Sequence, residues 1–344
     1  MTVVFYILVM VVVFGILIFI HEFGHFFTAR KCGVAIKEFA IGMGPKLFSK
    51  KSKKYETVYS LRAFPIGGFV SMEGEDEASD NENAFCNKKV WQRMLITIAG
   101  PLMNIILGFL LMMILVIAQG PIGSTTVAEF RENAVSDSQL MVGDKILKVD
   151  GTRVKSGNEV LYEISNQGYE PIDILVMRNG EKVLLENVTF PTFEEQGITF
   201  GDMDFKVLAE KRTFFNLMSQ TFTRSLSTVK MVIDSLVGLV NGRFGMDAVS
   251  GPIGVAEAVG EAAKTGPIQF LYIVCLLTIN LGVFNLIPFP ALDGGRFLLL
   301  IVEGFRRKPI NKKIEAYINF AGMVILLALM VFVSFKDILK LIFR

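Results

Sequence analysis

Histidine and cysteine are scarce in this sequence, and their placement argues against several kinds of site. The 344 residues include two histidines, His21 and His25, and three cysteines, Cys32, Cys86 and Cys275. Because the cysteines are odd in number, far apart and outside any Cys-x-x-Cys pair, they argue against a disulfide framework and a cysteine zinc site. The net charge of +2 is too small to indicate a nucleic-acid partner, so we expect none.

Apolar sequence is abundant and is gathered in long runs. Hydrophobic residues make up 52% of the chain, and the mean hydropathy is +0.50, more than is usual for a soluble domain. A helix needs about 20 such residues to cross a membrane. The runs predict four spanning helices, at 2–20, 94–118, 268–292 and 316–335. The first run is not typical of a cleaved signal peptide, because no basic residue precedes it and no small-residue cleavage site follows.

The basic residues in the loops predict the orientation of these spans, because cytoplasmic loops carry an excess of Lys and Arg. The short loop 305–313 is basic. So is the segment 30–54, with Arg30, Lys31, Lys37, Lys46, Lys50, Lys51, Lys53 and Lys54. We therefore expect both loops in the cytoplasm, with both chain termini and residues 120–210 on the outer side.

The expected outer region has the character of a small β-domain. Short β-type runs at 172–177 and 183–188 are separated by turn dipeptides. The stretch MVGDKILKVDGTRV at 141–154 resembles the strand-and-turn signature of PDZ domains, which bind extended peptides at a sheet edge. A generic β-domain is the alternative. Residues 214–240 have helical apolar spacing and predict an amphipathic helix at the outer interface, or a plain packing helix.

Both histidines belong to one H-E-x-x-H motif, in which Glu22 follows His21 and His25 comes four residues after His21. On a helix, positions i and i+4 share a face, so the two imidazoles can bind one metal ion. Glu22 can take a proton from a water whose pKa bound zinc lowers. The motif ends the first span, where ionisable groups are costly and indicate function. A polar pair that caps the helix at the interface is the alternative.

Asp293 is the expected third ligand. It follows the third apolar run, precedes Gly294 and Gly295, and reaches the same membrane depth as the histidines in the topology above. Two histidines and one carboxylate form a common catalytic zinc set. Without the histidines, a turn residue before two glycines would be the better interpretation of Asp293.

The segment before Asp293 is expected to be unwound. Pro288 and Pro290 interrupt a spanning helix, and lipid tolerates this only where the freed backbone groups face protein or water. Such a segment beside a metal can hold an extended substrate, and a simple kink is the alternative. Asn104 is a polar residue of the second span, in the stretch GPLMN, and a helix–helix hydrogen bond is its plain interpretation.

The stretches HEFGH, GPLMN and NLIPFPALDGGR together resemble the site-2 protease family of intramembrane metalloproteases, and most closely the bacterial regulator-of-sigma-E protease type. SGPIG and FPIGGFVSMEG are also similar to that type. The resemblance implies that His21, His25 and Asp293 bind Zn²⁺ and that Glu22 is the general base.

The same resemblance implies residues that bind substrate. Asn285 and Asn280 would position it, and the segment with Gly67 and Gly68 would form a membrane-dipping β-hairpin that engages the substrate strand. Some relatives carry two tandem PDZ domains, whereas the outer region here has room for one.

The expected fold is a polytopic α-helical membrane protein with four transmembrane helices, a membrane-associated β-hairpin and an inserted extracytoplasmic PDZ domain. We expect an N-terminal membrane part at 1–119, the PDZ domain at 120–200, an amphipathic helix and linker at 201–266, and a C-terminal membrane part at 267–344. The resemblance implies a multi-pass protein of the bacterial inner membrane, with its active site near the cytoplasmic face. It would cut single-span membrane proteins, such as anti-sigma factors and signal-peptide remnants, within or near their transmembrane segments.

Two other functions remain open at this point. A membrane-anchored zinc protease that cuts soluble proteins would need a large soluble catalytic domain after the H-E-x-x-H motif, and the sequence shows none. A non-catalytic scaffold that binds partners through its PDZ domain would not need Glu22, which is intact together with the Leu-Asp-Gly motif.

Overall fold

The structure of this chain is a computed structural model that describes residues 2–53, 56–75, 77–195, 198–243, 245 and 249–342. Lys54, one of the basic residues that predict orientation, lies outside the described residues. The chain forms two compact units, which we call the helical unit (Met1–Leu111 with Val249–Arg344) and the sheet unit (Met112–Ala248).

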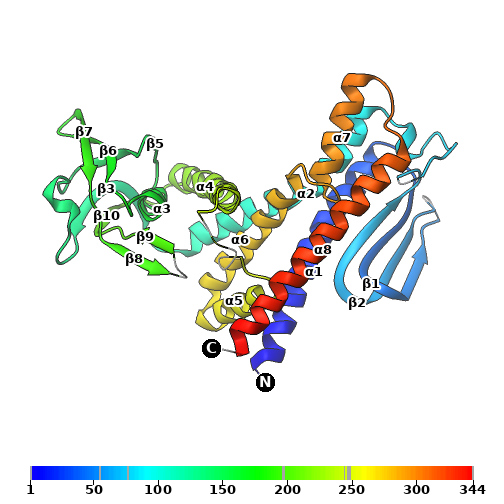
Figure 1. The fold of residues 1–344 in the computed structure, drawn as a ribbon, viewed down its shortest axis with the longest axis horizontal. Helices are drawn as coiled ribbons and strands as arrows, with labels where there is room; N and C mark the ends of the chain where they lie inside the picture. Colours follow the sequence, from blue (N-terminus) through cyan, green and yellow to red (C-terminus); the bar gives the residue numbers. More distant parts are fainter. Residues whose placement is uncertain are drawn as a thin grey trace. The chain divides into compact units, whose positions relative to one another are not determined.

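The helical unit is built on helices that are long and apolar enough to cross a membrane (Figure 1). The described residues form four of them, namely α1 (Thr2–Lys31), α2 (Val90–Ala118, which ends in the sheet unit), α6 (Pro267–Leu286) and α8 (Lys312–Ile342). Only 11% to 33% of the most apolar window of each helix is buried within the protein. Such exposed apolar surface suits hydrocarbon rather than water. The four predicted spans are therefore confirmed as helices.

The third of these helices ends earlier than the apolar run. α6 ends at Leu286, whereas the run continues to residue 292. Pro288 and Pro290 explain the difference, because proline lacks a backbone N–H and its ring clashes with the preceding helical turn. The chain then turns at Ala291, which has a φ of 71°, and α7 (Asp293–Arg306) begins.

A short helix before α6, α5 (Pro252–Thr265), is capped by a side chain from the other end of the chain. Asp337 of α8 is buried, and its Oδ2 accepts hydrogen bonds from the N–H groups of Gly251 and Gly254, each at 2.9 Å. The first N–H groups of a helix lack partners within the helix, and a carboxylate satisfies them and complements the helix dipole. A Cβ at Gly251 would lie 2.8 Å from the same oxygen, so the SGPIG stretch makes room for this cap.

A long hairpin, β1 (Ile36–Lys51) and β2 (Val58–Met72), completes the helical unit together with the single turn η1 (Phe85–Asn87). β1 pairs with both halves of β2, because Ala40 lies opposite Phe69 in one register and opposite Ser60 in another. Among the strands that the structure describes, the β2 segment 68–72 pairs only with β1, so its other edge is open to the interior of the unit.

Glu38 of β1 links the two strands of this hairpin through its side chain. Its carboxylate accepts hydrogen bonds from the Ser60 hydroxyl at 2.5 Å and from the Arg62 guanidinium at 2.8 Å, and pairs with Lys46 at 2.9 Å. Burial raises the pKa of this carboxyl, but the three donors outweigh burial and lower the pKa to about 2. Glu38 is therefore ionised throughout the physiological range.

The sheet unit contains one principal sheet with the strand order β10–β3–β4–β6–β7, and β5 pairs with β4. Its strands are β3 (Ile122–Phe130), β4 (Lys145–Val149), β5 (Thr152–Arg153), β6 (Ile172–Arg178), β7 (Glu181–Val188) and β10 (Phe205–Glu210). A separate pair is formed by β8 (Thr192–Glu195) and β9 (Ile198–Gly201), and a single turn, η2 (Ser136–Ser138), follows β3. Residues that alternate along β4 and β6, such as Ile146 and Ile174, form the core with Val160 and Ile164 of α3 (Gly157–Gln167).

This sheet continues past residue 200, where the sequence predicts the domain to end. β10 pairs antiparallel with β3, and the buried Asp204 just before β10 accepts hydrogen bonds from the N–H groups of Val135 and Ser136. The helix predicted at 214–240 is confirmed as α4 (Phe214–Val240). α4 packs on α3, where the Tyr162 hydroxyl donates to Asp234 at 2.9 Å.

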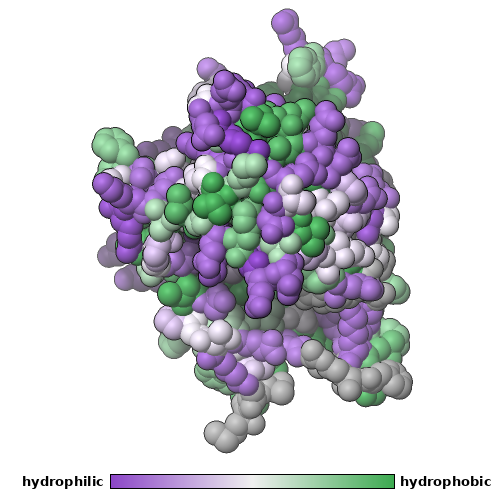
Figure 2. All heavy atoms as spheres, turned by 90° about the vertical axis from the view of Figure 1, so that its left-hand side faces the viewer, coloured by the Kyte–Doolittle hydropathy of each residue, from purple (hydrophilic) through white to green (hydrophobic). Residues whose placement is uncertain are grey.

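The surface of the sheet unit differs from that of the long helices. Figure 2 views the side on which β6 and β7 lie in Figure 1, and there hydrophilic side chains surround separate, small apolar patches. The apolar window of α8, by contrast, is only 11% buried. The sheet unit thus presents a surface suited to water.

Candidate metal centre

The two histidines lie one turn apart on α1 and face the interior of the helical unit. Their exposed fractions are 8% for His21 and 9% for His25. The Nε2 atoms of the two rings are 3.2 Å apart, as the i, i+4 spacing of a helix allows. Two buried imidazoles with their nitrogens turned toward each other present a paired donor set for one metal ion.

Asp293 reaches these histidines because the chain folds back sharply before α7. The fold-back leaves no space for side chains at the next two positions. A Cβ at Gly294 would lie 2.3 Å from the Ile287 carbonyl oxygen, and a Cβ at Gly295 would lie 2.2 Å from that of Phe289. The two glycines therefore let the start of α7 pack on the broken end of α6, which places Asp293 beside α1.

Three ligand atoms then form a small triangle. Asp293 Oδ2 lies 3.0 Å from His21 Nε2 and 3.3 Å from His25 Nε2. Zinc bonds of about 2.0–2.1 Å in tetrahedral geometry separate neighbouring ligand atoms by about 3.3–3.4 Å. Asp293 Oδ2 is also buried and makes no hydrogen bond of good geometry, although both ring nitrogens are close. The three atoms therefore fit a shared zinc ion better than they fit hydrogen bonds to one another.

One face of α2 supports the two histidine rings. The Nδ1 of His25 lies 2.8 Å from the carbonyl oxygen of Ile96, and the Nδ1 of His21 lies 3.3 Å from the Asn104 amide. Between these contacts, a Cβ at Gly100 would lie 2.3 Å from His25 Nε2. Residues 96, 100 and 104 are four apart and share a helical face, so α2 contacts both rings over two turns.

Glu22 shares a cavity of about 330 Å³ with His21, His25 and Asp293. Phe69 and Val70 of the open β2 edge form another part of its wall. A Cβ at Gly68 would lie 3.5 Å from Glu22 Cγ and 2.8 Å from the Ala40 carbonyl oxygen, so this edge runs close to Glu22. The cavity thus combines a metal-ligand set, a carboxylate and an unpaired strand edge.

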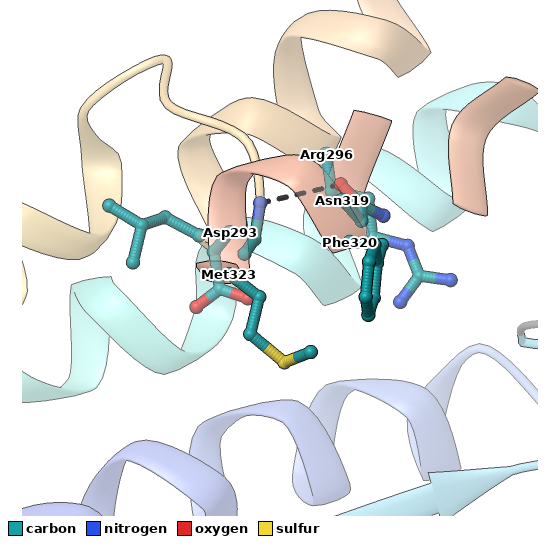
Figure 3. A pocket seen from close by; sticks show the side chains of 7 residues that line it. Asp293, Arg296, Asn319, Phe320 and Met323 are labelled. Atoms are coloured by element: carbon teal, nitrogen blue, oxygen red, sulfur yellow. Dashed lines mark hydrogen bonds between the residues drawn. The ribbon is translucent and has the colours of Figure 1, made fainter. Parts of the chain in front are cut away.

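A second cavity of about 380 Å³ borders Asp293 from the side of α8. Figure 3 shows its lining, with Asn319, Phe320 and Met323 of α8 facing the segment around Asp293. The amide oxygen of Asn319 accepts a hydrogen bond from the N–H of Ala291 at 3.4 Å. One freed backbone donor of the broken segment is therefore satisfied by α8.

The structure brings together some of the predicted substrate residues and not others. Asn285 lines the Glu22 cavity, and its amide donates to the Leu281 carbonyl of its own helix at 3.0 Å. Gly68 lies beside Glu22. Gly67 and Asn280 do not appear among the residues that line the described cavities.

An ion pair in the cavity wall, between Arg296 and Glu75, was not predicted. Arg296, one turn after Asp293, donates to the Glu75 carboxylate and to the Glu75 main-chain oxygen. Lys312 donates to the same main-chain oxygen at 3.1 Å. The sequence features that could have indicated this contact are a basic residue three positions after Asp293 and the acidic stretch that contains Glu75.

Comparisons with known proteins agree with this site. Residues 9–329 match the model of peptidase family M50. The regulator of sigma-W protease RasP of Bacillus subtilis is 29% identical over 96% of this chain and 97% of its own length. The zinc metalloprotease RasP of Bacillus licheniformis is 30% identical over 96% and 98%, and a Fusobacterium nucleatum protein assigned as a zinc metalloprotease is 35% identical over 97% and 98%. The chain therefore belongs to peptidase family M50, the site-2 protease family of zinc-dependent membrane metalloproteases.

Proposed function

We propose that this chain hydrolyses peptide bonds within or near the transmembrane segments of single-span membrane proteins, with His21, His25 and Asp293 as zinc ligands and Glu22 as the general base. The observation that carries the proposal is the triangle of ligand atoms, 3.0–3.3 Å on each side, in one cavity with Glu22.

Each residue has a distinct role in this proposal. His21, His25 and Asp293 would hold a zinc ion, which would lower the pKa of a water molecule and polarise the scissile carbonyl. The Glu22 carboxylate accepts the proton of the attacking water and returns it to the leaving nitrogen. The Ile96 carbonyl and Asn104 amide hold the histidine rings in place from α2.

The β2 edge provides the means of holding the substrate. A helical segment hides its peptide carbonyls in its own hydrogen bonds, so it must unwind before it can be cut. The segment 68–72 has an open edge beside Glu22, and an extended substrate strand can pair with it. Asn285 lines the same cavity and would hydrogen-bond the same strand.

The remaining parts of the proposal concern placement and substrates. The basic loops at 30–54 and 305–313 support a cytoplasmic position for the metal centre, with both termini and the sheet unit outside the bacterial plasma membrane. The sheet unit, whose GDKILKVDG turn resembles PDZ domains, would recognise a peptide. The name of the Bacillus subtilis relative, a regulator of sigma-W protease, supports anti-sigma factors as substrates, and signal-peptide remnants are the second substrate class.

The test is cleavage of a panel of tagged single-span substrates in liposomes, with bound zinc measured for every variant. We expect Glu22→Gln to keep its zinc and to cut about 10²–10⁴-fold more slowly than the unmodified protein, the usual contribution of a general base. Glu132→Gln, a change at an exposed glutamate of the sheet unit, is the matched control and should cut normally.

The outcomes separate the alternatives. Loss of cleavage with zinc retained supports Glu22 as the base. Normal cleavage by Glu22→Gln would refute that role. Cleavage of soluble casein without cleavage of any span would favour an anchored protease of soluble proteins, and substrate capture without cleavage by the unmodified, zinc-loaded protein would favour a scaffold.

A further inference from the structure

The Asn104 side chain of α2 lies against the His21 ring. It is fully buried, with an exposed fraction of 0%, and its neighbours from Gly100 to Leu111 along α2 carry no other polar side chain. Its Nδ2 lies 3.3 Å from His21 Nδ1, and its Oδ1 is buried without a hydrogen-bond partner. A buried amide is costly unless it is hydrogen-bonded, so this position needs an explanation.

The chemistry of imidazole supplies that explanation. His21 Nε2 faces Asp293 Oδ2 at 3.0 Å and His25 Nε2 at 3.2 Å, so Nε2 is the nitrogen that faces the metal position. A neutral imidazole carries one hydrogen, and a metal-binding Nε2 requires that hydrogen on Nδ1. The group facing Nδ1 must then accept a hydrogen bond rather than donate one.

We propose that Asn104 is a positioning residue whose amide oxygen accepts the Nδ1 hydrogen of His21, which fixes the tautomer and ring orientation that leave Nε2 free for zinc. This inference rests on the proposed role of His21 as a zinc ligand. A half-turn of the amide exchanges Oδ1 and Nδ2 without changing its shape. The exchange gives the orphaned Oδ1 a partner and turns a donor away from Nδ1.

The other histidine shows the same arrangement with a different acceptor. His25 Nδ1 lies 2.8 Å from the Ile96 carbonyl oxygen, which can only accept a hydrogen bond. Ile96 and Asn104 are two turns apart on one face of α2, opposite rings that are one turn apart on α1. Each zinc-binding ring thus has one acceptor from α2 at its Nδ1. Removal of such a partner of a metal-bound histidine usually weakens metal binding about 10–100-fold.

The first experiment measures the zinc dissociation constant of the full-length protein by chelator competition. Asn104→Leu keeps the size of the side chain and removes its acceptor, so we expect zinc to bind about 10–100-fold more weakly. Asn104→Asp supplies only acceptors and should bind zinc at least as tightly as the unmodified protein. Thr278→Val, which also removes a buried polar group from a spanning helix, is the matched control and should bind zinc normally.

A second measurement covers the case in which Asn104→Asp fails to fold. The chain has only two histidines, so histidine labelled with ¹⁵N gives resonances from two rings alone. In the zinc-loaded protein in lipid, both Nδ1 hydrogens should show the downfield shift of a hydrogen-bonded N–H. In Asn104→Leu the His21 hydrogen should move upfield, while the His25 hydrogen, bonded to Ile96, should stay in place.

The results distinguish this inference from the proposed function. Unchanged zinc binding and an unchanged His21 resonance in Asn104→Leu would overturn the inference. Equal weakening in folded Asn104→Leu and Asn104→Asp would also overturn it, because an acceptor would then not be what His21 needs. If His21→Ala loses zinc binding, the proposed metal site stands whatever Asn104→Leu and Asn104→Asp show. If His21→Ala binds zinc fully, the metal site itself is refuted.

Discussion

Gly100 is the position where the smallest change should have the largest effect on the metal centre. In Gly100→Ala, the new Cβ would lie 2.3 Å from His25 Nε2 and 2.8 Å from both neighbouring ring carbons. Ordinary contacts between such atoms are about 3.5 Å. The His25 ring or the α2 backbone must therefore move by about 1 Å, whereas a zinc–nitrogen bond tolerates about 0.2 Å.

The expected size of the effect follows from the loss of one ligand. Complete four-ligand zinc sites contribute about 10–16 kcal/mol, so one ligand is worth on the order of 3 kcal/mol. At about 1.4 kcal/mol per factor of ten, the zinc dissociation constant of Gly100→Ala should rise about 100-fold. Cleavage of a single-span substrate should fall with zinc occupancy and recover in part at high zinc concentration.

The assay is chelator competition for zinc, run beside substrate cleavage and thermal unfolding. Gly304→Ala is the matched control, because the new Cβ would meet only Val90 Cγ1 at an ordinary 3.6 Å. The control should bind zinc normally and be as stable as the unmodified protein. Unchanged zinc affinity in a folded Gly100→Ala protein would refute the reasoning, because the close approach of α2 to His25 would then not constrain the site.

Three further outcomes are expected. A strong chelator should abolish cleavage, and added Zn²⁺ should restore it; cleavage that survives complete zinc removal, checked by elemental analysis, would contradict the metal centre. Glu303→Met leaves the buried Arg93 without its carboxylate partner and should destabilise the protein by about 3–5 kcal/mol, whereas the double change with Arg93→Met should restore most of the stability in a thermal unfolding assay. Asp204→Ala removes the acceptor for the Val135 and Ser136 N–H groups and should cost about 2–4 kcal/mol, seen as faster proteolysis of the sheet unit with zinc content unchanged.

The sequence predicted those parts of the site that depend on local periodicity. His21, Glu22 and His25 are tied to one another by the helical repeat, so their relation could be predicted without a tertiary structure. Asp293 could be matched to them by membrane depth, because lipid restricts where a polar group at a helix end can lie. The roles of these four residues in binding and catalysis stay predictions until the variants are measured.

The contacts that the sequence did not predict depend on main-chain atoms or on long-range packing. The Ile96 carbonyl oxygen is a main-chain atom, so no residue type marks it as a partner of His25. The fit of Gly100 against His25 depends on how closely α1 and α2 approach. Pro288 was enough to predict a break near the end of α6, which ends at Leu286. The fold-back before α7 could not be predicted, because it depends on how closely Gly294 and Gly295 pack against the end of α6.

The spread of the metal ligands along the chain has a consequence for biosynthesis. Two of the proposed ligands, His21 and His25, lie within the first 25 residues, and the third is Asp293. A ribosome that has made α1, α2 and the whole sheet unit has therefore produced a chain with only two of the three proposed ligands. The nascent chain cannot assemble the complete centre until α6 has been inserted and α7 has folded back. With these proposed ligands, the protease should be inactive until α7 has folded back, because its metal centre is incomplete until then.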